Sequence, residues 1–194
     1  MKKLIISLGI VVTLFCSCSK DDSSKNNTES KINSVLNEKD YESQKLMYQM
    51  LSKNEKYQIW TVKMEKLISD SKLNNQQVSL LNNLKNQLNV NLFDTKLNID
   101  EREVFKTIYV KDFLNKAKRL FTKKYVFENF FTINGNANLS KIDYTKPVCS
   151  CNQSSIWSCA MGAYTCKETD KCRKDSDGCG FFGLYECNGN CFNN

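Results

Sequence analysis

The stretch from residue 32 to residue 131 contains neither glycine nor proline, and its apolar residues recur three and four positions apart. This spacing places them on one face of an α-helix, so it predicts amphipathic helices that pack against one another. The four apolar stripes are Ile32, Val35, Leu36, Leu46, Met47, Met50 and Leu51; Tyr57, Trp60, Met64, Leu67 and Ile68; Val78, Leu81, Leu84 and Leu88; and Phe105, Ile108, Tyr109, Phe113, Ala117, Leu120 and Phe121. The pattern therefore predicts a small helical bundle, the helical domain (31–131).

Short polar motifs precede three of these stripes. They are SKNE (52–55), NNQQ (74–77) and DERE (100–103). Each has the form of a capping box, in which the first and fourth side chains satisfy free backbone N–H groups at a helix start. We therefore expect the last three helices to begin at these motifs.

The helical pattern ends where the composition changes. Residues 132–147 read TINGNANLSKIDYTKP, with the Gly, Asn, Ser and Pro content of a loop. We expect a linker over 132–148, followed by a cysteine-rich module (149–194). The cysteines of this module are Cys149, Cys151, Cys159, Cys166, Cys172, Cys179, Cys187 and Cys191.

The spacing of these eight cysteines decides between a metal site, a redox site and disulfides. It contains no C-x-x-C pair, which zinc knuckles and redox motifs both require. A module this small buries too little apolar surface to fold unaided, so disulfides are needed. We expect four disulfides of open connectivity, short β-strands, and no metal or cofactor. The fold class is then mainly α: a small helical bundle followed by a disulfide-rich module with little β-structure.

Several aromatic residues have two interpretations. Trp60 lies in an apolar stripe, which favours a core position over a ligand platform. In the cysteine-rich module, Trp157, Phe181 and Phe182 form either a small core or an exposed patch that contacts a membrane. We take these three as candidate membrane-contact residues.

The N-terminal sequence predicts export. MKKLIISLGIVVTLFCSC has two lysines, an apolar run and a small residue before Cys18, like a bacterial lipoprotein signal. Residues 1–17 would be removed, Cys18 acylated, and 18–30 left as a flexible polar tether. The sequence Lys20-Asp21-Asp22 resembles the acidic export tag of surface lipoproteins. We expect a protein lipid-anchored to the outer membrane, facing the periplasm or the outside, where disulfides form.

Composition and charge argue against two classes of function, enzymes and nucleic-acid-binding proteins. The chain has no histidine, and no phosphate loop or nucleophile motif is present, so we do not expect an enzyme. The formal charge is +7, but the cysteine-rich module has four basic and five acidic residues, a net charge of −1. It is therefore not expected to bind nucleic acid.

The cysteine-rich module resembles a known peptide. CSC (149–151), a cysteine every six or seven residues, GCG (178–180) and CNGN (187–190) are similar to fulvocin C, and the whole chain is similar to fulvocin C-related bacteriocin proteins. The chain departs from that pattern where Tyr185 replaces a cysteine and Cys191 supplies the eighth. The resemblance implies an antibacterial peptide directed at membranes.

Two functions follow as hypotheses. In the first, the protein is a bacteriocin precursor: a protease cuts within 132–148, at Lys141-Ile142, and releases the module onto a target-cell membrane. In the second, it is a cell-surface lipoprotein whose attached module binds a carbohydrate, peptide or partner protein as its surface ligand. A module found free of the helices would favour the first hypothesis, and one that stays attached would favour the second.

Overall fold

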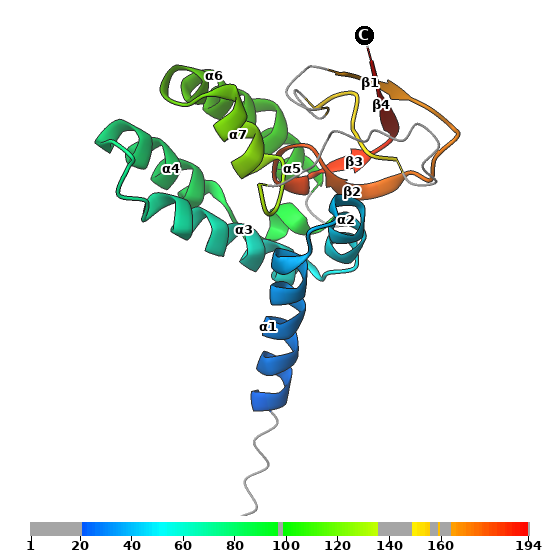
Figure 1. Ribbon diagram of the computed structural model, residues 1–194, viewed down its shortest axis with the longest axis horizontal. Helices are drawn as coiled ribbons and strands as arrows, with labels where there is room; N and C mark the ends of the chain where they lie inside the picture. The colour runs from blue at the N-terminus through cyan, green and yellow to red at the C-terminus, as the bar shows by residue number, and fades with distance from the viewer. Residues whose placement is uncertain (1–20, 97–98, 136–148, 156–158, 160–163, 194) are drawn as a thin grey trace, which may run out of the picture.

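The computed structural model describes residues 21–96, 99–135, 149–155, 159 and 164–193. Most of the described chain is helical and the strands are few and short, so the predicted fold class is confirmed (Figure 1). The helical elements are α1 (Asp21–Asn37), α2 (Tyr41–Gln49), α3 (Lys53–Ile68), α4 (Asn75–Gln87), η1 (Val90–Phe93), α5 (Ile99–Val104), η2 (Phe105–Tyr109), α6 (Val110–Leu120), α7 (Lys123–Phe130) and η4 (Phe181–Gly183). The strands are β1 (Tyr164–Glu168), β2 (Asp175–Cys179), β3 (Tyr185–Cys187) and β4 (Gly189–Asn193).

Two of the three predicted capping boxes are confirmed. Ser52 and Glu55 cap the start of α3, and Asn74 and Gln77 cap the start of α4, each pair with both reciprocal hydrogen bonds. The third prediction is wrong in detail, because α5 begins at Ile99 and Asp100 lies inside its first turn. An acidic residue in the first turn interacts favourably with the helix dipole, so the motif marks the start without supplying the cap.

The predicted first helix is two helices. Asp40 accepts a hydrogen bond from the Ser43 backbone N–H, which starts α2 afresh after the break at residues 38–40. The new helix phase buries Tyr48 and exposes Leu46 and Met50, which the stripe had placed in the core.

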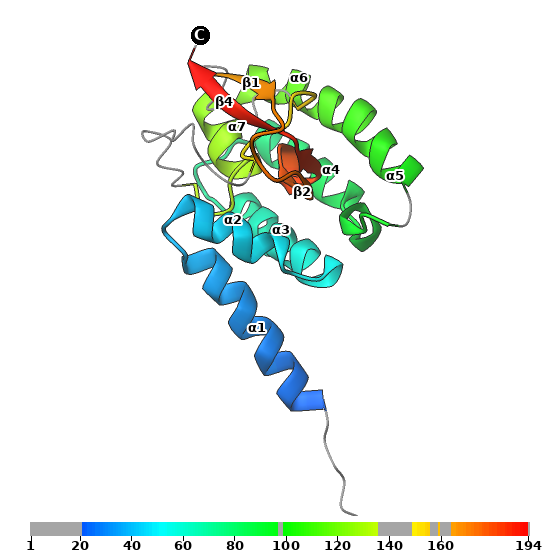
Figure 2. The ribbon, with the colours of Figure 1, turned by 90° about the vertical axis from the view of Figure 1, so that its right-hand side faces the viewer.

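The first helix also starts earlier than expected. α1 begins at Asp21, so residues 21–30 of the predicted tether are helical. Adding turns to an existing helix costs less than starting one, and the packed residues Ile32 and Val35 supply that start. In Figures 1 and 2, α1 extends away from the other elements. No helix in the described part of the chain is long and apolar enough to cross a membrane.

The last predicted helix is interrupted and then followed by another. A π-helical turn, η2, joins α5 to α6. It holds one more residue per turn, which shifts the helix face and leaves Ile108 and Tyr109 exposed rather than in the core. After Leu120, Thr122 caps α7, a helix that the apolar stripes did not predict.

The cysteine-rich module forms two small antiparallel sheets. β1 pairs with β4, and β2 pairs with β3. All eight cysteines form disulfides, as expected, with the pairs Cys149–Cys172, Cys151–Cys166, Cys159–Cys191 and Cys179–Cys187.

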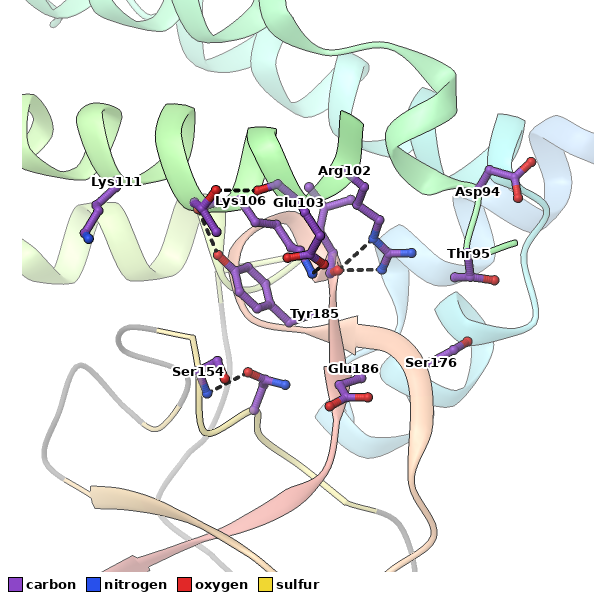
Figure 3. A pocket seen from close by; sticks show the side chains of 13 residues that line it. Asp94, Thr95, Arg102, Glu103, Lys106, Lys111, Ser154, Ser176, Tyr185 and Glu186 are labelled. Atoms are coloured by element: carbon purple, nitrogen blue, oxygen red, sulfur yellow. Dashed lines mark hydrogen bonds and ion pairs between the residues drawn. The ribbon is translucent and has the colours of Figure 1, made fainter. Parts of the chain in front are cut away.

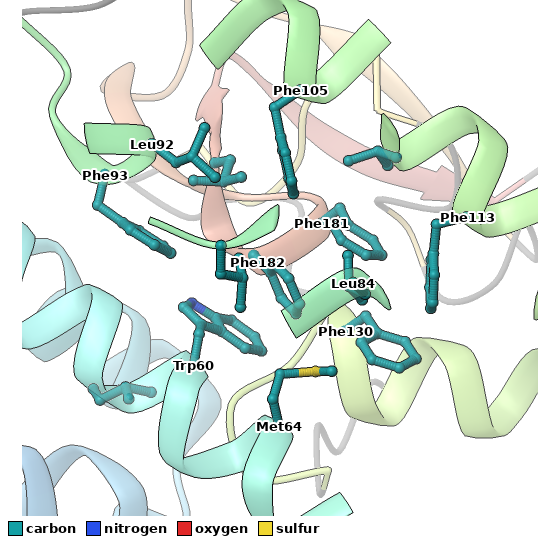
Figure 4. Packing of buried hydrophobic residues seen from close by; sticks show 14 of the residues in the cluster. Trp60, Met64, Leu84, Leu92, Phe93, Phe105, Phe113, Phe130, Phe181 and Phe182 are labelled. Carbon is teal, nitrogen blue, oxygen red and sulfur yellow. The ribbon is translucent and has the colours of Figure 1, made fainter. Parts of the chain in front are cut away.

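The module shares its core with the helical domain. The aromatic loop (residues 180–184), between β2 and β3, inserts Phe181, Phe182 and Leu184 into the bundle, where each is at most 1% exposed. Figure 4 shows both rings among Trp60, Phe113 and Phe130 and other side chains of the helices. Phe181 and Phe182 therefore form no exposed patch in the intact chain, because the helices bury what the small module cannot, and their contact with a membrane after release stays a prediction. Trp157 lies outside the described residues.

Glycine permits the close approach of the aromatic loop. Phe182 has φ +54° between Gly180 and Gly183, which also have positive φ. A Cβ atom on Gly183 would lie 2.8 Å from the Tyr48 ring. Because glycine has no Cβ atom, the aromatic loop can lie against the Tyr48 ring without a clash.

The Lys63 side chain hydrogen-bonds to backbone oxygens at the C-terminal end of α7. The Lys63 amine donates hydrogen bonds to the backbone oxygens of Glu128 (2.9 Å) and Thr132 (2.6 Å) and lies 5.4 Å from the Trp60 ring centre. Burial lowers the pKa of Lys63 to about 7, and the Glu128 carboxylate opposes this shift only in part. Two N–H bonds of a neutral amine suffice for the two carbonyl oxygens.

Trp60→Ala should lower the free energy of unfolding by about 3–5 kcal/mol, because the indole is 1% exposed and its Nε1 donates to Tyr48. Met50→Ala is the matched control: Met50 is 87% exposed, so its removal should change stability by less than about 0.5 kcal/mol. Denaturant unfolding measures both. Equal effects from the two variants would contradict the core position of Trp60.

Lys63 should make stability depend on pH. Between pH 7 and its ordinary pKa of 10.5, the unfolded chain holds a proton that the folded chain has lost. The free energy of unfolding should therefore rise as the pH rises from 7 to about 9. Unfolding of the wild type and Lys63→Met across this range measures the rise, which Lys63→Met should lose and the exposed Lys66→Met should keep. An unchanged slope in Lys63→Met would contradict this assignment.

Candidate functional site

A polar cleft of about 590 Å³ lies where the helices meet the cysteine-rich module. One wall comes from the segment after η1 and from α5, η2 and the start of α6; the other comes from the loop after Cys151 and from β2 and β3 (Figure 3). Its lining residues are Asp94, Thr95, Arg102, Glu103, Lys106, Thr107, Lys111, Asn152, Ser154, Ser176, Leu184, Tyr185 and Glu186. Neither half of the chain forms this cleft alone.

Tyr185 connects the two walls. Its half-buried ring points from β3 toward the π turn, and its hydroxyl donates to the Lys106 backbone oxygen at 3.4 Å (Figure 3). The Lys106 amine lies 5.1 Å from the ring centre and pairs with Glu103. Burial, with a smaller contribution from the Glu103 carboxylate, raises the pKa of Tyr185 to about 12. The phenol therefore stays protonated at neutral pH and remains a hydrogen-bond donor.

Arg102 holds the module against the helices. Its side chain is 7% exposed, and Nε donates to the Leu184 oxygen at 3.0 Å, with a second hydrogen bond from Nη2 to the same oxygen. Burial lowers the pKa of Arg102, and the nearby Asp177 carboxylate opposes that change. The guanidinium therefore fixes the position of the chain just before Tyr185.

The module supplies short polar side chains that are held by local hydrogen bonds. Asn152 is buried and its Oδ1 accepts from the Ser154 backbone N–H at 2.8 Å. Glu186 is exposed and accepts from the Asn188 side chain at 3.0 Å. The exposed carboxylate of Glu186 has lone pairs to accept further hydrogen bonds.

Positive and negative side chains balance in the cleft. The cations of its lining are Arg102, Lys106 and Lys111, and the anions are Asp94, Glu103 and Glu186. A strongly anionic or cationic ligand would meet like charges on the helical wall, and an anionic ligand would also meet Glu186 on the module wall. The arrangement instead favours a neutral polar molecule that both donates and accepts hydrogen bonds and packs on Tyr185.

A second hollow of about 700 Å³ lies between α1, α3 and the chain after α7. Lys63 lines it, but the amine of Lys63 already donates to two backbone oxygens. This hollow therefore offers a less distinctive set of polar groups than the cleft at Tyr185.

One sulfur cluster has the geometry of a metal site but not the chemistry. The Sγ atoms of Cys151, Cys159 and Cys166 lie within 4.8 Å of one another. All three belong to disulfides, so none is a thiolate that could bind a metal.

Some of the site residues predicted from sequence lie outside the described part of the chain, and others lie in the core. Cys18 lies outside the described residues, as Trp157 does, and Phe181 and Phe182 lie in the core. The cleft itself was missed, because its walls are far apart in the sequence. The one available signal was Tyr185, the residue that departs from the fulvocin C-like cysteine pattern.

A scan against protein-family models, a search of curated proteins and a search of solved structures each found no match. The cleft and the packing of the two halves are the features of the molecule that bear on its function.

Proposed function

We propose that the protein is an exported lipoprotein, anchored through Cys18, that binds a neutral saccharide in the cleft around Tyr185. The observation that carries this proposal is that both the helical domain and the cysteine-rich module form the cleft. A site of this kind exists only while the module stays attached, as the binding hypothesis requires. The protein therefore works as one unit rather than as the precursor of a released peptide.

The chemistry of the lining supports a saccharide. Sugar hydroxyl groups both donate and accept hydrogen bonds, so they can pair with carboxylates such as Glu186 and with amides and hydroxyls such as Asn152 and Ser154. The Tyr185 ring offers apolar surface for the C–H groups of a sugar. A peptide is the nearest alternative, because it has the same mixture of donors and acceptors.

A second candidate function is the bacteriocin precursor that the fulvocin C resemblance implies. The observation that favours it is the complete burial of Phe181 and Phe182 by the helices. A protective domain would cover the membrane-active residues of a toxin in this way. This function requires a step that separates the module from the helices, because the rings cannot reach a membrane while they are buried.

Tyr185→Ala should weaken saccharide binding by about tenfold or more, because it removes the aromatic surface of the cleft. Tyr109→Ala is the matched control: Tyr109 is exposed on η2 and does not line the cleft, so binding should be unchanged. A glycan array probed with the labelled Cys18→Ala protein identifies a ligand, and calorimetry measures the two variants.

Glu186→Gln tests the cleft in a second way, in case Tyr185→Ala does not fold. Glu186 is exposed and its replacement keeps the side-chain size, so this variant should fold normally. It should also weaken binding. If no glycan binds, while the oxidised module alone kills related bacteria, the bacteriocin function replaces this proposal.

The anchor is tested separately. Cys18→Ala should abolish incorporation of radiolabelled fatty acid and move the protein to the soluble fraction, because acylation needs the Cys18 thiol. Cys16→Ala should remain lipidated, since bulky Phe15 before Cys16 disfavours cleavage there. Fatty acid incorporation into the Cys18→Ala protein would show that the anchor is elsewhere.

A further inference from the structure

We propose that the helical domain is a binding site for the oxidised cysteine-rich module, and that it keeps the module bound after the chain between them is cut. The ligand of this site is the aromatic loop, closed by the Cys179–Cys187 disulfide. This inference does not depend on what the cleft around Tyr185 binds.

No disulfide joins the two halves. All four disulfides link cysteines within residues 149–191, and the remaining two cysteines of the chain, Cys16 and Cys18, precede the described residues. A cut between Gly135 and Cys149 therefore leaves only noncovalent contacts to hold the module.

The apolar contacts resemble those inside a domain core. The Phe182 ring centre lies 4.7 Å from that of Trp60, and the Phe181 ring centre lies 5.5 Å from that of Phe113 and 5.7 Å from that of Phe130. Both phenylalanine side chains are fully buried, as Figure 4 illustrates. Large buried aromatic residues at the centre of an interface carry most of its binding energy.

Buried polar contacts surround the aromatic loop. The Lys56 amine pairs with the Asp177 carboxylate at 2.6 Å, and both residues are at most 6% exposed. Tyr48 donates to the Phe182 oxygen at 3.1 Å, and Lys45 donates to the Cys149 oxygen at 2.5 Å. Separation would exchange these contacts for contacts with water, so each adds a modest net stabilisation, and together they fix the orientation of the module.

The module is also preorganised for binding. The Cys179–Cys187 disulfide and the pairing of β2 with β3 both hold together the two ends of the aromatic loop. A loop held in its bound shape loses little conformational entropy on docking, so more of the contact energy appears as affinity. For the bacteriocin function, the consequence is that cleavage alone would not release an active peptide.

The test cuts the chain and asks whether the halves separate. A recognition sequence for a site-specific protease is inserted between Lys141 and Ile142 of the exported protein carrying Cys18→Ala. After complete cleavage, gel filtration without reductant at about 1 μM should show both fragments in one peak, as for a dissociation constant below that concentration. Separation of the wild-type fragments would overturn the proposal.

Variants identify the contacts that hold the module. Phe181→Ser/Phe182→Ser should weaken the association by at least about 100-fold, so that its fragments elute apart. Met50→Ser, a change at the exposed residue that follows α2, should leave them together. Co-elution of the double variant's fragments would show that the aromatic loop is not what the helices bind.

Gly183→Ala covers the case in which the double variant fails to fold. It keeps every ring and charge, but its Cβ would lie 2.8 Å from the Tyr48 ring at a residue with φ +65°. Intact mass should show all four disulfides formed, and the fragments should dissociate at least about tenfold more readily than the wild type. Unchanged retention in a correctly oxidised Gly183→Ala protein would also overturn the proposal.

Discussion

Phe181 and Phe182 need a hydrophobic environment, and the cysteine-rich module is too small to provide one. Its four disulfides restrict the chain but create little apolar interior, so the two rings would face water in an isolated module. The helices provide the missing interior, with Trp60, Met64, Phe113 and Phe130 among the residues that surround the rings. The two segments, although different in composition, therefore form one core.

This shared core determines the other contacts between the halves. With the aromatic loop in place, Asp177 reaches Lys56, and the Leu184 oxygen reaches Arg102. Tyr185 then projects beside the π turn, where its ring meets Lys106. The cleft is a product of docking: the helices supply most of its charges, and the module supplies its aromatic surface and its buried amide.

Local interactions were the predictable part of this structure. The caps of α3 and α4 depend on residues three positions apart, so they could be identified from sequence. The break before α2 depends on one Asp40 hydrogen bond within a continuous apolar pattern, which gave no sign of it. The burial of Phe182 and the position of Tyr185 depend on contacts more than 70 residues apart, which no local pattern encodes.

The order in which the parts of the shared core occur along the chain affects how the protein folds during biosynthesis. Helices α2 to α7 precede the aromatic loop, so they emerge from the ribosome or a translocation channel before the residues that fill their interior. Until residues 180–184 arrive, Trp60 lacks the Phe182 ring and Phe130 lacks the rings of Phe181 and Phe182, so the core of the helices is incomplete. Completion of the core is thus delayed until a late segment is available and oxidised. Such a delay would suit the export proposed above, in which the chain crosses a membrane in extended form before it folds.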